Sequence, residues 1–579
     1  MLLKKINLPN DVKKLNISEL SELSQEVRSR IVEVTLQNGG HIGASLGAVE
    51  LIVSLLYVFD AEKDKIVFDV GHQAYAYKIL TGRNAEFDSL RTFGGISGFP
   101  KPSESKYDSF VGGHAGNAIS AACGYAKARE LSGENYEVIS VLGDGVMVNG
   151  ETAEGLNLAS SIGKQIIVLN DNTYSISEGV GSVPEYLKAL RAKPCSTKLR
   201  KGEESPFAHY DLSYIGPVCG HDIPSLVKAF ETAKNSDKSV VLHIVTSKGK
   251  GYLPAEQNPL KLHGVPPKGE RDAVSFGSVF GKTLVKLREK DDKIVAIAAA
   301  MAIGTGLSEF VDRFPNSFID VGIAESTAVS VAAALARAGF KPYVAIYSTF
   351  LQRAYDQMLY DVAMDDLGVT FIVDRAGIVG EDGESHQGIY DLCLLSSVSS
   401  SRVFSPSSGG ELEKMLEYCA SVPGLKVIRY PKGSAETGIP TNADFPHWVT
   451  IKQGNSNAFI VAHGARMVQN AMEAASVLEK DGISVGVVNA RSIKPFDSKF
   501  LSSVQGARLF VLEDVVYSGS LSENLLANGF DVSAITLPDG YVTFGKVSEL
   551  QRLFGLDAES VAAKIKKEYE TGRFSGGKR

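Results

Sequence analysis

Short runs of β-branched and aliphatic residues alternate with longer segments of helical periodicity along almost the whole chain. The first helix is the clearest, because its apolar residues recur every three or four positions until the glycine pair at 39–40 ends the pattern. These apolar residues are Leu20, Leu23, Val27, Ile31 and Val34. The alternation predicts an α/β fold built on parallel sheets.

Several apolar runs have the length of buried strands. They lie at residues 138–142, 165–169, 317–322, 343–347, 369–373, 425–429, 458–462, 483–488 and 509–512. Two aperiodic stretches rich in proline, glycine and charge, 261–271 and 431–446, indicate linkers. The pattern therefore predicts three α/β domains at 1–260, 272–432 and 449–579. Residues 184–210, which carry an Arg/Lys cluster, are expected to form a mobile excursion from the first domain.

The composition is that of a globular chain with a large core, and it excludes some functions. Of 579 residues, 44% are hydrophobic, and 60 basic against 67 acidic residues leave a net charge of −7. No global positive field exists to hold nucleic acid or anionic lipid, so an anionic ligand must be bound by a few placed donors. Glycine is in excess, at 57 residues, and it concentrates where backbone turns sharply or approaches a ligand closely.

The chain is expected to be soluble and cytoplasmic. Its five cysteines are widely spaced and form no C-x-x-C pair, which argues against a disulfide framework or a zinc site and favours a reducing compartment. The N-terminus leads into polar sequence rather than a signal peptide, and the longest apolar run, 294–303, is shorter than a membrane span.

A candidate metal site follows two neighbouring predicted strands. The run at 138–142 leads into a Gly-Asp-Gly turn centred on Asp144, and the run at 165–169 leads into Asn-Asp-Asn, which ends at Asn172. One crossover helix between them makes the strands parallel, so both polar ends share the sheet edge where α/β proteins bind ligands. A carboxylate and an amide oxygen suit Mg²⁺, which keeps positions for water and a diphosphate. The alternative is that Gly-Asp-Gly is only a tight turn.

Glu325 is a second candidate. It follows the apolar run at 317–322 and heads a helical segment, in surroundings expected to remove water from its carboxyl group. Burial raises the pKa of a carboxyl group, so that it can exchange protons near neutrality. The alternative is a first-turn acid that interacts with the helix dipole.

Together these features resemble the thiamine-diphosphate enzymes, whose metal motif pairs Gly-Asp-Gly with a later asparagine; here Asp144 and Asn172 are 28 positions apart. Longer blocks, spread over nearly the whole chain, resemble the 1-deoxy-D-xylulose-5-phosphate synthases. They are GGHIGASLG (39–47), DVGHQAYAYKILTGR (69–83), GGISGFP (94–100), YIGPVCGHD (214–222), TSKGKGY (246–252), AIYSTFLQRAYDQ (345–357) and DRAGIVGEDG (374–383).

The resemblance implies a site for thiamine diphosphate and Mg²⁺. Asp144, Asn172 and the backbone carbonyl of Tyr174 would bind the metal, which holds the cofactor's diphosphate. Glu325 would hydrogen-bond the aminopyrimidine ring and favour the imino tautomer whose nitrogen removes the thiazolium C2 proton, and Phe350 would stack on that ring. The other residues that would line the cofactor are His72, Gly113, His114, Ala115, Gly145, Val146 and Tyr252.

The resemblance also implies roles in proton transfer and substrate binding. His41, Asp382 and His386 would serve proton transfer and orientation. Guanidinium forks suit a phosphate dianion, so the arginines would face the phosphate of the acceptor. The residues that would hold the acceptor are Tyr347, Arg353, Arg375 and Arg429. Arg353 also fits a helix-surface residue that pairs with Asp356, and His209, His243, His447 and His463 are interpreted as structural.

The fold that the resemblance implies is transketolase-like: two thiamine-diphosphate-binding domains and a C-terminal α/β domain, in a homodimer. The implied reaction condenses pyruvate with D-glyceraldehyde 3-phosphate to 1-deoxy-D-xylulose 5-phosphate and CO₂. It is the first step of non-mevalonate isoprenoid precursor synthesis and also serves thiamine biosynthesis. Neither nucleic acid nor a membrane is expected as a partner.

The chain departs from the family pattern at several points. After Glu325 the family usually reads Gln-His-Ala, whereas this chain reads Ser-Thr-Ala, and the usual Gly-His-Ser-Ser is Gly-His-Ala-Gly at 113–116. The stretch 301–304 lacks the Arg-Glu that commonly follows its methionine, Cys219 replaces an aspartate, and the segment after Asn172 is short. The metal ligands, the glutamate and the phosphate arginines are all present.

Other functions compete with this interpretation. The stretch 43–47 fits the Gly-x-Ser-x-Gly elbow of serine hydrolases around Ser45, but a helical segment precedes it where that motif needs a strand. The stretch 277–283 approaches a phosphate-binding loop but has one residue too few between its glycines. A transketolase, a 2-oxoacid decarboxylase and a non-catalytic paralogue remain as alternatives.

Overall fold

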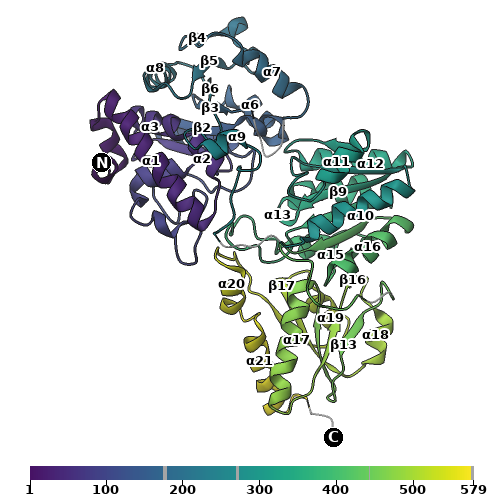
Figure 1. The fold of residues 1–579 in the computed structure, drawn as a ribbon. Coiled ribbons are helices and arrows are strands. Elements are labelled where there is room, and N and C mark those ends of the chain that lie inside the picture. Colours follow the sequence, from purple (N-terminus) through teal and green to yellow (C-terminus); the bar gives the residue numbers. More distant parts are fainter. Residues whose placement is uncertain (174–178, 269–272, 442–443, 575–579) are drawn as a thin grey trace. The chain divides into compact units, whose positions relative to one another are not determined.

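The computed structural model describes residues 1–173, 179–268, 273–441 and 444–574, and its tertiary contacts divide the chain into two compact units. Unit 1 comprises Met1–Glu270 with Gly322–Ala324, and unit 2 comprises Arg271–Val321 with Glu325–Arg579. Figure 1 shows one sheet in unit 1 and two in unit 2, each lined by helices. The α/β fold class predicted from the alternation of apolar runs and helical segments is confirmed.

The sheet of unit 1 has six strands in the order β1-β2-β3-β6-β5-β4, parallel except for β4. The strands are β1 (Lys65–Phe68), β2 (Val138–Gly143), β3 (Ile166–Asp171), β4 (Leu199–Arg200), β5 (Ser213–Cys219) and β6 (Val240–Val245). The helices are α1 (Ile17–Asn38), α2 (Ile42–Gly47), α3 (Val49–Val58), α4 (Tyr75–Lys78), α5 (Ala118–Ser132), α6 (Gly150–Ala159), α7 (Ser182–Arg191), α8 (Ile223–Lys234) and α9 (Leu253–Gln257). The central strands are buried on both faces, as parallel strands covered by helices require.

The larger sheet of unit 2 has seven strands in the order β16-β11-β12-β10-β9-β7-β8, parallel except for β16. The strands are β7 (Ile294–Ala298), β8 (Phe318–Asp320), β9 (Lys341–Tyr347), β10 (Thr370–Asp374), β11 (Arg402–Phe404), β12 (Lys426–Tyr430) and β16 (Ser492–Lys494). The helices are α10 (Phe276–Lys290), α11 (Ser308–Arg313), α12 (Glu325–Arg337), α13 (Ser348–Leu351), α14 (Tyr355–Gln357), α15 (Asp391–Ser397) and α16 (Gly409–Ser421).

The smaller sheet of unit 2 has the order β13-β15-β14-β17-β18, parallel except for β13. The strands are β13 (Val449–Lys452), β14 (Ala458–Ala462), β15 (Gly486–Asn489), β17 (Arg508–Val516) and β18 (Asp531–Leu537). The helices are α17 (Ala465–Lys480), α18 (Ser498–Ser503), α19 (Leu521–Ala527), α20 (Val547–Leu553) and α21 (Ala558–Glu570).

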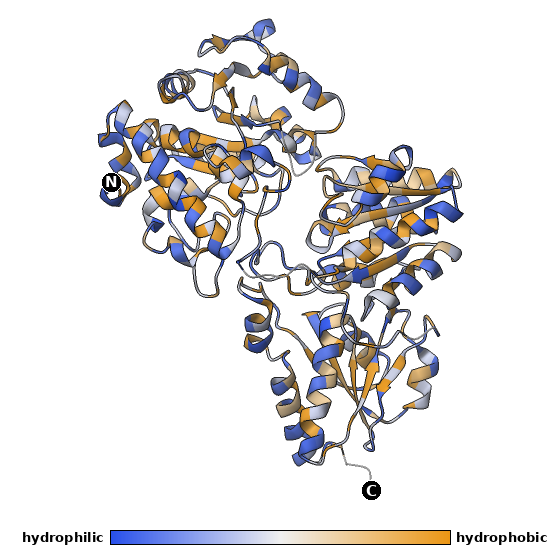
Figure 2. Ribbon diagram, viewed as in Figure 1, coloured by the Kyte–Doolittle hydropathy of each residue, from blue (hydrophilic) through white to orange (hydrophobic). Residues whose placement is uncertain are grey.

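Apolar side chains explain why these two sheets form one unit. One hydrophobic cluster runs from Val344 and Val373 of the larger sheet to Val488 and Val511 of the smaller one. In addition, β16 lies between β15 and β17 in sequence but pairs with β11, so the segment that joins two strands of the smaller sheet contributes a strand to the larger sheet. Figure 2 shows the sheets coloured mainly as hydrophobic and the helices as mixed. The domain boundaries given above stay a prediction.

Local sequence signals explain where the first helix begins and ends. The structure around Ser45 and residues 277–283 excludes the two alternative motifs. Asn16 caps α1 by accepting from the Glu19 backbone, and Gly39 ends the helix with a φ of +77°, a conformation that favours glycine. Ser45 is fully buried in α2, where its hydroxyl donates to the carbonyl of His72, so it is not the exposed serine of a hydrolase elbow. The stretch 277–283 lies inside helix α10, which excludes a phosphate-binding loop.

Residues 184–210 pack against the rest of unit 1, and their mobility stays a prediction. They include most of α7 and the strand β4, which pairs antiparallel with β5. Leu187, Leu190 and Phe207 are buried in a hydrophobic cluster of unit 1. Among the described residues, no helix is long and apolar enough to cross a membrane.

Candidate active site

Asp144 and Asn172 meet at the carboxyl edge of the sheet in unit 1. Strands β2 and β3 are in register there, with Gly143 opposite Asn170, and the backbone N–H of Asn172 hydrogen-bonds the Asp144 carboxylate. Burial and the neighbouring Asp171 raise the pKa of Asp144 to about 7. The charge of Arg191 opposes this rise without cancelling it, and a buried acidic group that still resists ionisation fits a site that receives a cation.

Asp171 itself is fully neutralised by protein groups. Arg191 donates to both of its oxygens at 2.6 and 2.8 Å, and Nε2 of His243 lies 2.8 Å from its Oδ2. Burial opposes ionisation, but the hydrogen bonds from His243 and Arg191 outweigh it and hold the pKa of Asp171 below its ordinary value. Asp171 is therefore a structural acid, and Arg191 ties helix α7 to the strand that carries Asn172. His243, with Tyr214 on its other nitrogen, has the structural role predicted for it.

The loops that carry His72 and His114 are joined by Asp69. This buried carboxylate follows β1 and accepts from the backbone N–H of Gly116 at 2.9 and 3.0 Å and of Ala118 at 3.1 Å. Gly116 has a φ of +96°, which lets the backbone turn toward the carboxylate. The sequence block 69–83 and the segment 113–116 are thus brought together by one side chain. Of the predicted metal ligands, Tyr174 lies outside the described residues.

Three histidine rings lie close together near this edge. The ring centroids of His41 and His72 are 5.9 Å apart, those of His41 and His263 5.7 Å, and those of His72 and His263 5.4 Å. Burial, aided by the charge of Lys248, holds the pKa of His263 well below its ordinary value, so this ring is neutral. Burial also lowers the pKa of Lys248 to about 8, although the charge of Asp144 opposes that shift.

His263 and Lys248 were missed among the candidate residues, for different reasons. Lys248 lies within the block TSKGKGY, where a lysine beside glycines has no pattern that distinguishes a ligand-binding cation from a surface one. His263 lies in the stretch 261–271, interpreted as a linker, yet Gly40 and Val265 exchange backbone hydrogen bonds that hold it against the start of α2. A pairing of two segments more than 200 residues apart leaves no periodicity in the sequence.

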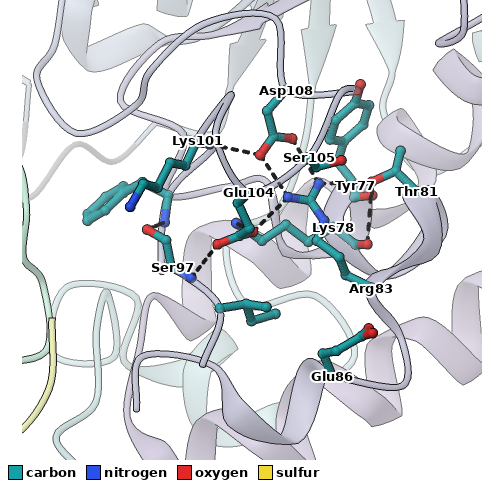
Figure 3. Close-up of polar contacts among 12 residues, drawn as sticks. Tyr77, Lys78, Thr81, Arg83, Glu86, Ser97, Lys101, Glu104, Ser105 and Asp108 are labelled. Atoms are coloured by element: carbon teal, nitrogen blue, oxygen red, sulfur yellow. Dashed lines mark hydrogen bonds and ion pairs between the residues drawn. The ribbon is translucent and has the colours of Figure 1, made fainter. Parts of the chain in front are cut away.

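An ion cluster fixes the loop that leads to His114. Figure 3 shows Arg83 hydrogen-bonded to Glu104 and to both oxygens of Asp108, at distances of 2.7 and 2.8 Å, while Lys78 also binds Glu104 at 2.5 Å. The backbone N–H groups of Ser97 and Lys101 donate to the same two carboxylates, Glu104 at 2.6 Å and Asp108 at 2.8 Å. The side chains of Lys78 and Asp108 are fully buried. The loop so fixed carries Phe99, whose ring centroid is 5.5 Å from that of His41.

We predict that Asp108→Ala lowers the free energy of unfolding by about 3–5 kcal/mol, because it leaves the guanidinium of Arg83 buried without its bidentate partner. Thermal or urea unfolding of purified protein measures the change. Asp237→Ala is the matched control, since Asp237 pairs with Lys201 at the surface of the same unit and its loss should leave the Tm unchanged. Equal destabilisation by both variants would contradict a special role for the buried pair.

Glu325 is the first residue of α12 in unit 2 and is only 5% exposed. Burial raises its pKa, while its own backbone N–H and the charge of Arg353 oppose that rise. The predicted desolvation of this carboxyl group is therefore present. Arg353 acts electrostatically on Glu325, a relation that neither of its sequence-based interpretations included.

Two of the four predicted acceptor residues, Tyr347 and Arg375, lie at the carboxyl ends of β9 and β10. Tyr347 and Asp374 are opposite one another in register, and the guanidinium carbon of Arg375 lies 4.0 Å from the centre of the Tyr347 ring. Phe350 stacks on Tyr347 with centroids 6.0 Å apart and meets His386 edge-on at 5.5 Å. The Tyr347 hydroxyl is buried and has no hydrogen-bond partner among the described residues, so a ligand can accept from it.

Arg429 does not fit the phosphate-binding role predicted for it. Its side chain is 2% exposed, and its guanidinium donates to both oxygens of the buried Asp391 at 2.8 and 3.1 Å. A further N–H faces Nδ1 of His463, which binds Glu513 through Nε2. Arg429 thus belongs to a buried network that links the two sheets of unit 2. Lys432, three residues on, is partly exposed and lies 3.8 Å from Glu381, so it is the more accessible cation.

The sequence is similar to known families over most of its length. The model described as 1-deoxy-D-xylulose-5-phosphate synthase matches residues 3–206 and 202–246. The transketolase pyrimidine binding domain matches 272–437, and the transketolase C-terminal domain matches 447–561.

Curated relatives agree with these matches. A 1-deoxy-D-xylulose-5-phosphate synthase of Dictyoglomus thermophilum is 43% identical, with 98% of each chain covered. That of Carboxydothermus hydrogenoformans is 42% identical, over 98% of this chain and 99% of that protein. A transketolase structure from Campylobacter jejuni matches at 18% identity and a TM-score of 0.46, over 96% of this chain and 100% of that one. With full-length relatives above 40% identity, the chain belongs to the 1-deoxy-D-xylulose-5-phosphate synthase family.

Proposed function

We propose that this protein condenses pyruvate with D-glyceraldehyde 3-phosphate, with loss of CO₂, to give 1-deoxy-D-xylulose 5-phosphate. The observation that carries the proposal is the agreement of family membership with two chemically fitting sites. One is the cation-accepting edge at Asp144 and Asn172, and the other is the buried carboxyl group of Glu325. The product would enter isoprenoid precursor and thiamine synthesis.

The cofactor implied is thiamine diphosphate with Mg²⁺. Asp144 and Asn172, with the Tyr174 carbonyl predicted beside them, would hold the metal, and the charge of Lys248 would favour the cofactor's diphosphate. His72, Gly113, His114, Ala115, Gly145, Val146 and Tyr252 would line the cofactor. When bound there, the cofactor would supply the carbanion and electron-sink chemistry that decarboxylation of a 2-oxoacid needs.

The chain's own residues would move protons and exclude water around that chemistry. Glu325 would share a proton with a ring nitrogen of the aminopyrimidine, against which Phe350 stacks. His41, His72 and the neutral His263 would form a desolvated wall with hydrogen-bonding nitrogens for the carboxylate and carbonyl oxygens of pyruvate. Asp382 and His386 would orient the acceptor and transfer protons at its aldehyde oxygen.

The acceptor's phosphate would be held by cations at the carboxyl ends of β10 and β12. Arg375 has a guanidinium fixed over Tyr347 and can present a fork to two phosphate oxygens. Lys432 would take the place predicted for Arg429, because it is partly exposed whereas Arg429 is buried. The Tyr347 hydroxyl would donate to the acceptor.

We also propose a homodimer in the cytoplasm. Family membership supports the dimer. The absence of a C-x-x-C pair among five dispersed cysteines supports a reducing compartment.

A comparison of donors tests the proposal against transketolase. Purified protein with Mg²⁺, thiamine diphosphate and D-glyceraldehyde 3-phosphate is given either pyruvate or a ketose phosphate. We expect a five-carbon deoxy sugar phosphate from pyruvate, read by mass spectrometry, and turnover with the ketose phosphate at least about 100-fold slower. Preference for the ketose phosphate would establish the transketolase alternative.

A further inference from the structure

The chain makes an unusual turn where β10 ends. Arg375 follows directly on Asp374 and has a φ of +59°, in the left-handed region that residues other than glycine rarely adopt. Such a conformation persists only where neighbouring groups hold it, and it occurs often at ligand sites. Beyond Arg375, the N–H of Ala376 donates to the carbonyl of Tyr430 at 2.9 Å, which fixes the far side of the turn.

Asp374 holds the near side of the turn. Its Oδ1 accepts from the backbone N–H of Arg375 at 2.6 Å, and the residue is only 6% exposed. This hydrogen bond gives the Arg375 N–H a side-chain acceptor in place of the carbonyl that it would bind in a regular strand. The buried carboxyl group therefore has a specific local acceptor role.

The turn determines where the guanidinium of Arg375 lies. Because Asp374 and Tyr347 are opposite in register, the left-handed turn brings the Arg375 side chain back across the end of β9 and over the Tyr347 ring, at 4.0 Å. Tyr347 is 3% exposed and stacks on Phe350, so the surface beneath the guanidinium is rigid. An extended conformation at Arg375 would point its side chain elsewhere.

Electrostatics supports the same arrangement. Burial raises the pKa of Asp374 to about 6, against the opposing effects of the Arg375 charge, the Arg375 N–H and the Lys432 charge. Asp374 thus lies within range of both cations assigned to the acceptor's phosphate.

We propose that Asp374 is a positioning residue that sets the orientation of Arg375 through the Arg375 backbone N–H and thereby selects a phosphorylated acceptor over its unphosphorylated analogue. The inference rests on the proposed function, because it assigns the selection to that acceptor site. Asp374 touches neither the reacting atoms nor the phosphate, and acts only through its neighbour.

The test compares two acceptors, D-glyceraldehyde 3-phosphate and D-glyceraldehyde, with pyruvate saturating. For Asp374→Ala, we expect the KM for the phosphorylated acceptor to rise about 10-fold or more, while the KM for D-glyceraldehyde stays within about twofold of wild type. Asp374→Asn keeps an oxygen that accepts from the Arg375 N–H, and should restore the KM for the phosphorylated acceptor to within about threefold. Folding of each variant is checked by its Tm.

A double-mutant cycle with Arg375→Ala shows whether the effect passes through the arginine. In the Arg375→Ala background, Asp374→Ala should raise the KM no further, because the group it positions is gone. If the alanine variant does not fold, Asp374→Gln replaces it, since its amide oxygen lies one methylene too far along for the same hydrogen bond.

Three results would overturn the inference. They are equal changes in KM for both acceptors, full additivity in the cycle, and an asparagine variant as impaired as the alanine variant. A wild-type protein that makes no product from either acceptor would instead refute the proposed function.

Discussion

Replacing Glu325 with glutamine should lower kcat by about 10²–10⁴-fold while thiamine diphosphate still binds. Glutamine keeps the length and a hydrogen bond of glutamate but exchanges no proton. Glu325 is buried at the start of α12, and burial raises its pKa, which favours a carboxyl group that holds a proton shared with a partner. The expected loss is therefore one of turnover rather than of affinity.

Steady-state kinetics at saturating cofactor and titration calorimetry of the cofactor measure the two quantities separately. Glu309→Gln is the matched control, because Glu309 is an exposed glutamate on α11 and its replacement should change neither. Near-normal kcat in Glu325→Gln would show that the carboxyl group does not take part in proton transfer. Loss of cofactor binding without loss of kcat at saturation would assign it a binding role instead.

Asp144→Asn should abolish the stabilisation that Mg²⁺ and thiamine diphosphate give the protein. Replacing a direct ligand should cost more affinity than the about 10–100-fold lost when groups behind the ligands are changed. In metal-free protein, by contrast, Asp144→Asn should not destabilise the folded state at neutral or higher pH. Burial and Asp171 raise the pKa of Asp144 from 3.8 to about 7, so the folded state keeps a proton that the unfolded chain releases.

The sign of the pH dependence follows from that difference. Asp144 lowers the stability of the metal-free protein progressively as the pH rises from about 4 to about 7. At pH 8 the metal-free asparagine variant should therefore have a Tm equal to or above that of wild type. Thermal unfolding with and without Mg²⁺ and cofactor measures both effects, and Asp237→Asn serves as control. A variant that keeps the wild-type rise in Tm would show that Asp144 does not bind the metal.

Much of the fold could be predicted because parallel strands buried on both faces are continuous apolar runs. The runs at 138–142, 343–347 and 458–462 lie within β2, β9 and β14. Strands such as β4, β11 and β16 are only two or three residues long, and no run of apolar residues marks them. Each of them forms a strand because it hydrogen-bonds a neighbouring strand, and the local sequence pattern carries no information about that neighbour.

The same distinction applies to the candidate site. Asp144 and Glu325 could be found because each follows a strand in a motif with a chemical reason. The burial of Arg429 could not, because the sequence does not distinguish a strand arginine that faces a ligand from one that faces a buried acid. Only the position of Asp391 decides between them. His263 and Lys248 can be recognised as site residues only from the fold, which places His263 beside His72 and Lys248 within electrostatic range of Asp144.

The central claim is the reaction itself, and isotope labelling tests it most directly. Purified protein is incubated with Mg²⁺, thiamine diphosphate, D-glyceraldehyde 3-phosphate and pyruvate labelled with ¹³C at either C1 or C2. We expect label from C1 to leave as CO₂ and label from C2 to become the keto carbon of 1-deoxy-D-xylulose 5-phosphate, as read by mass spectrometry and ¹³C NMR. A five-carbon phosphate that contains no pyruvate carbon, or no such product at all, would contradict it.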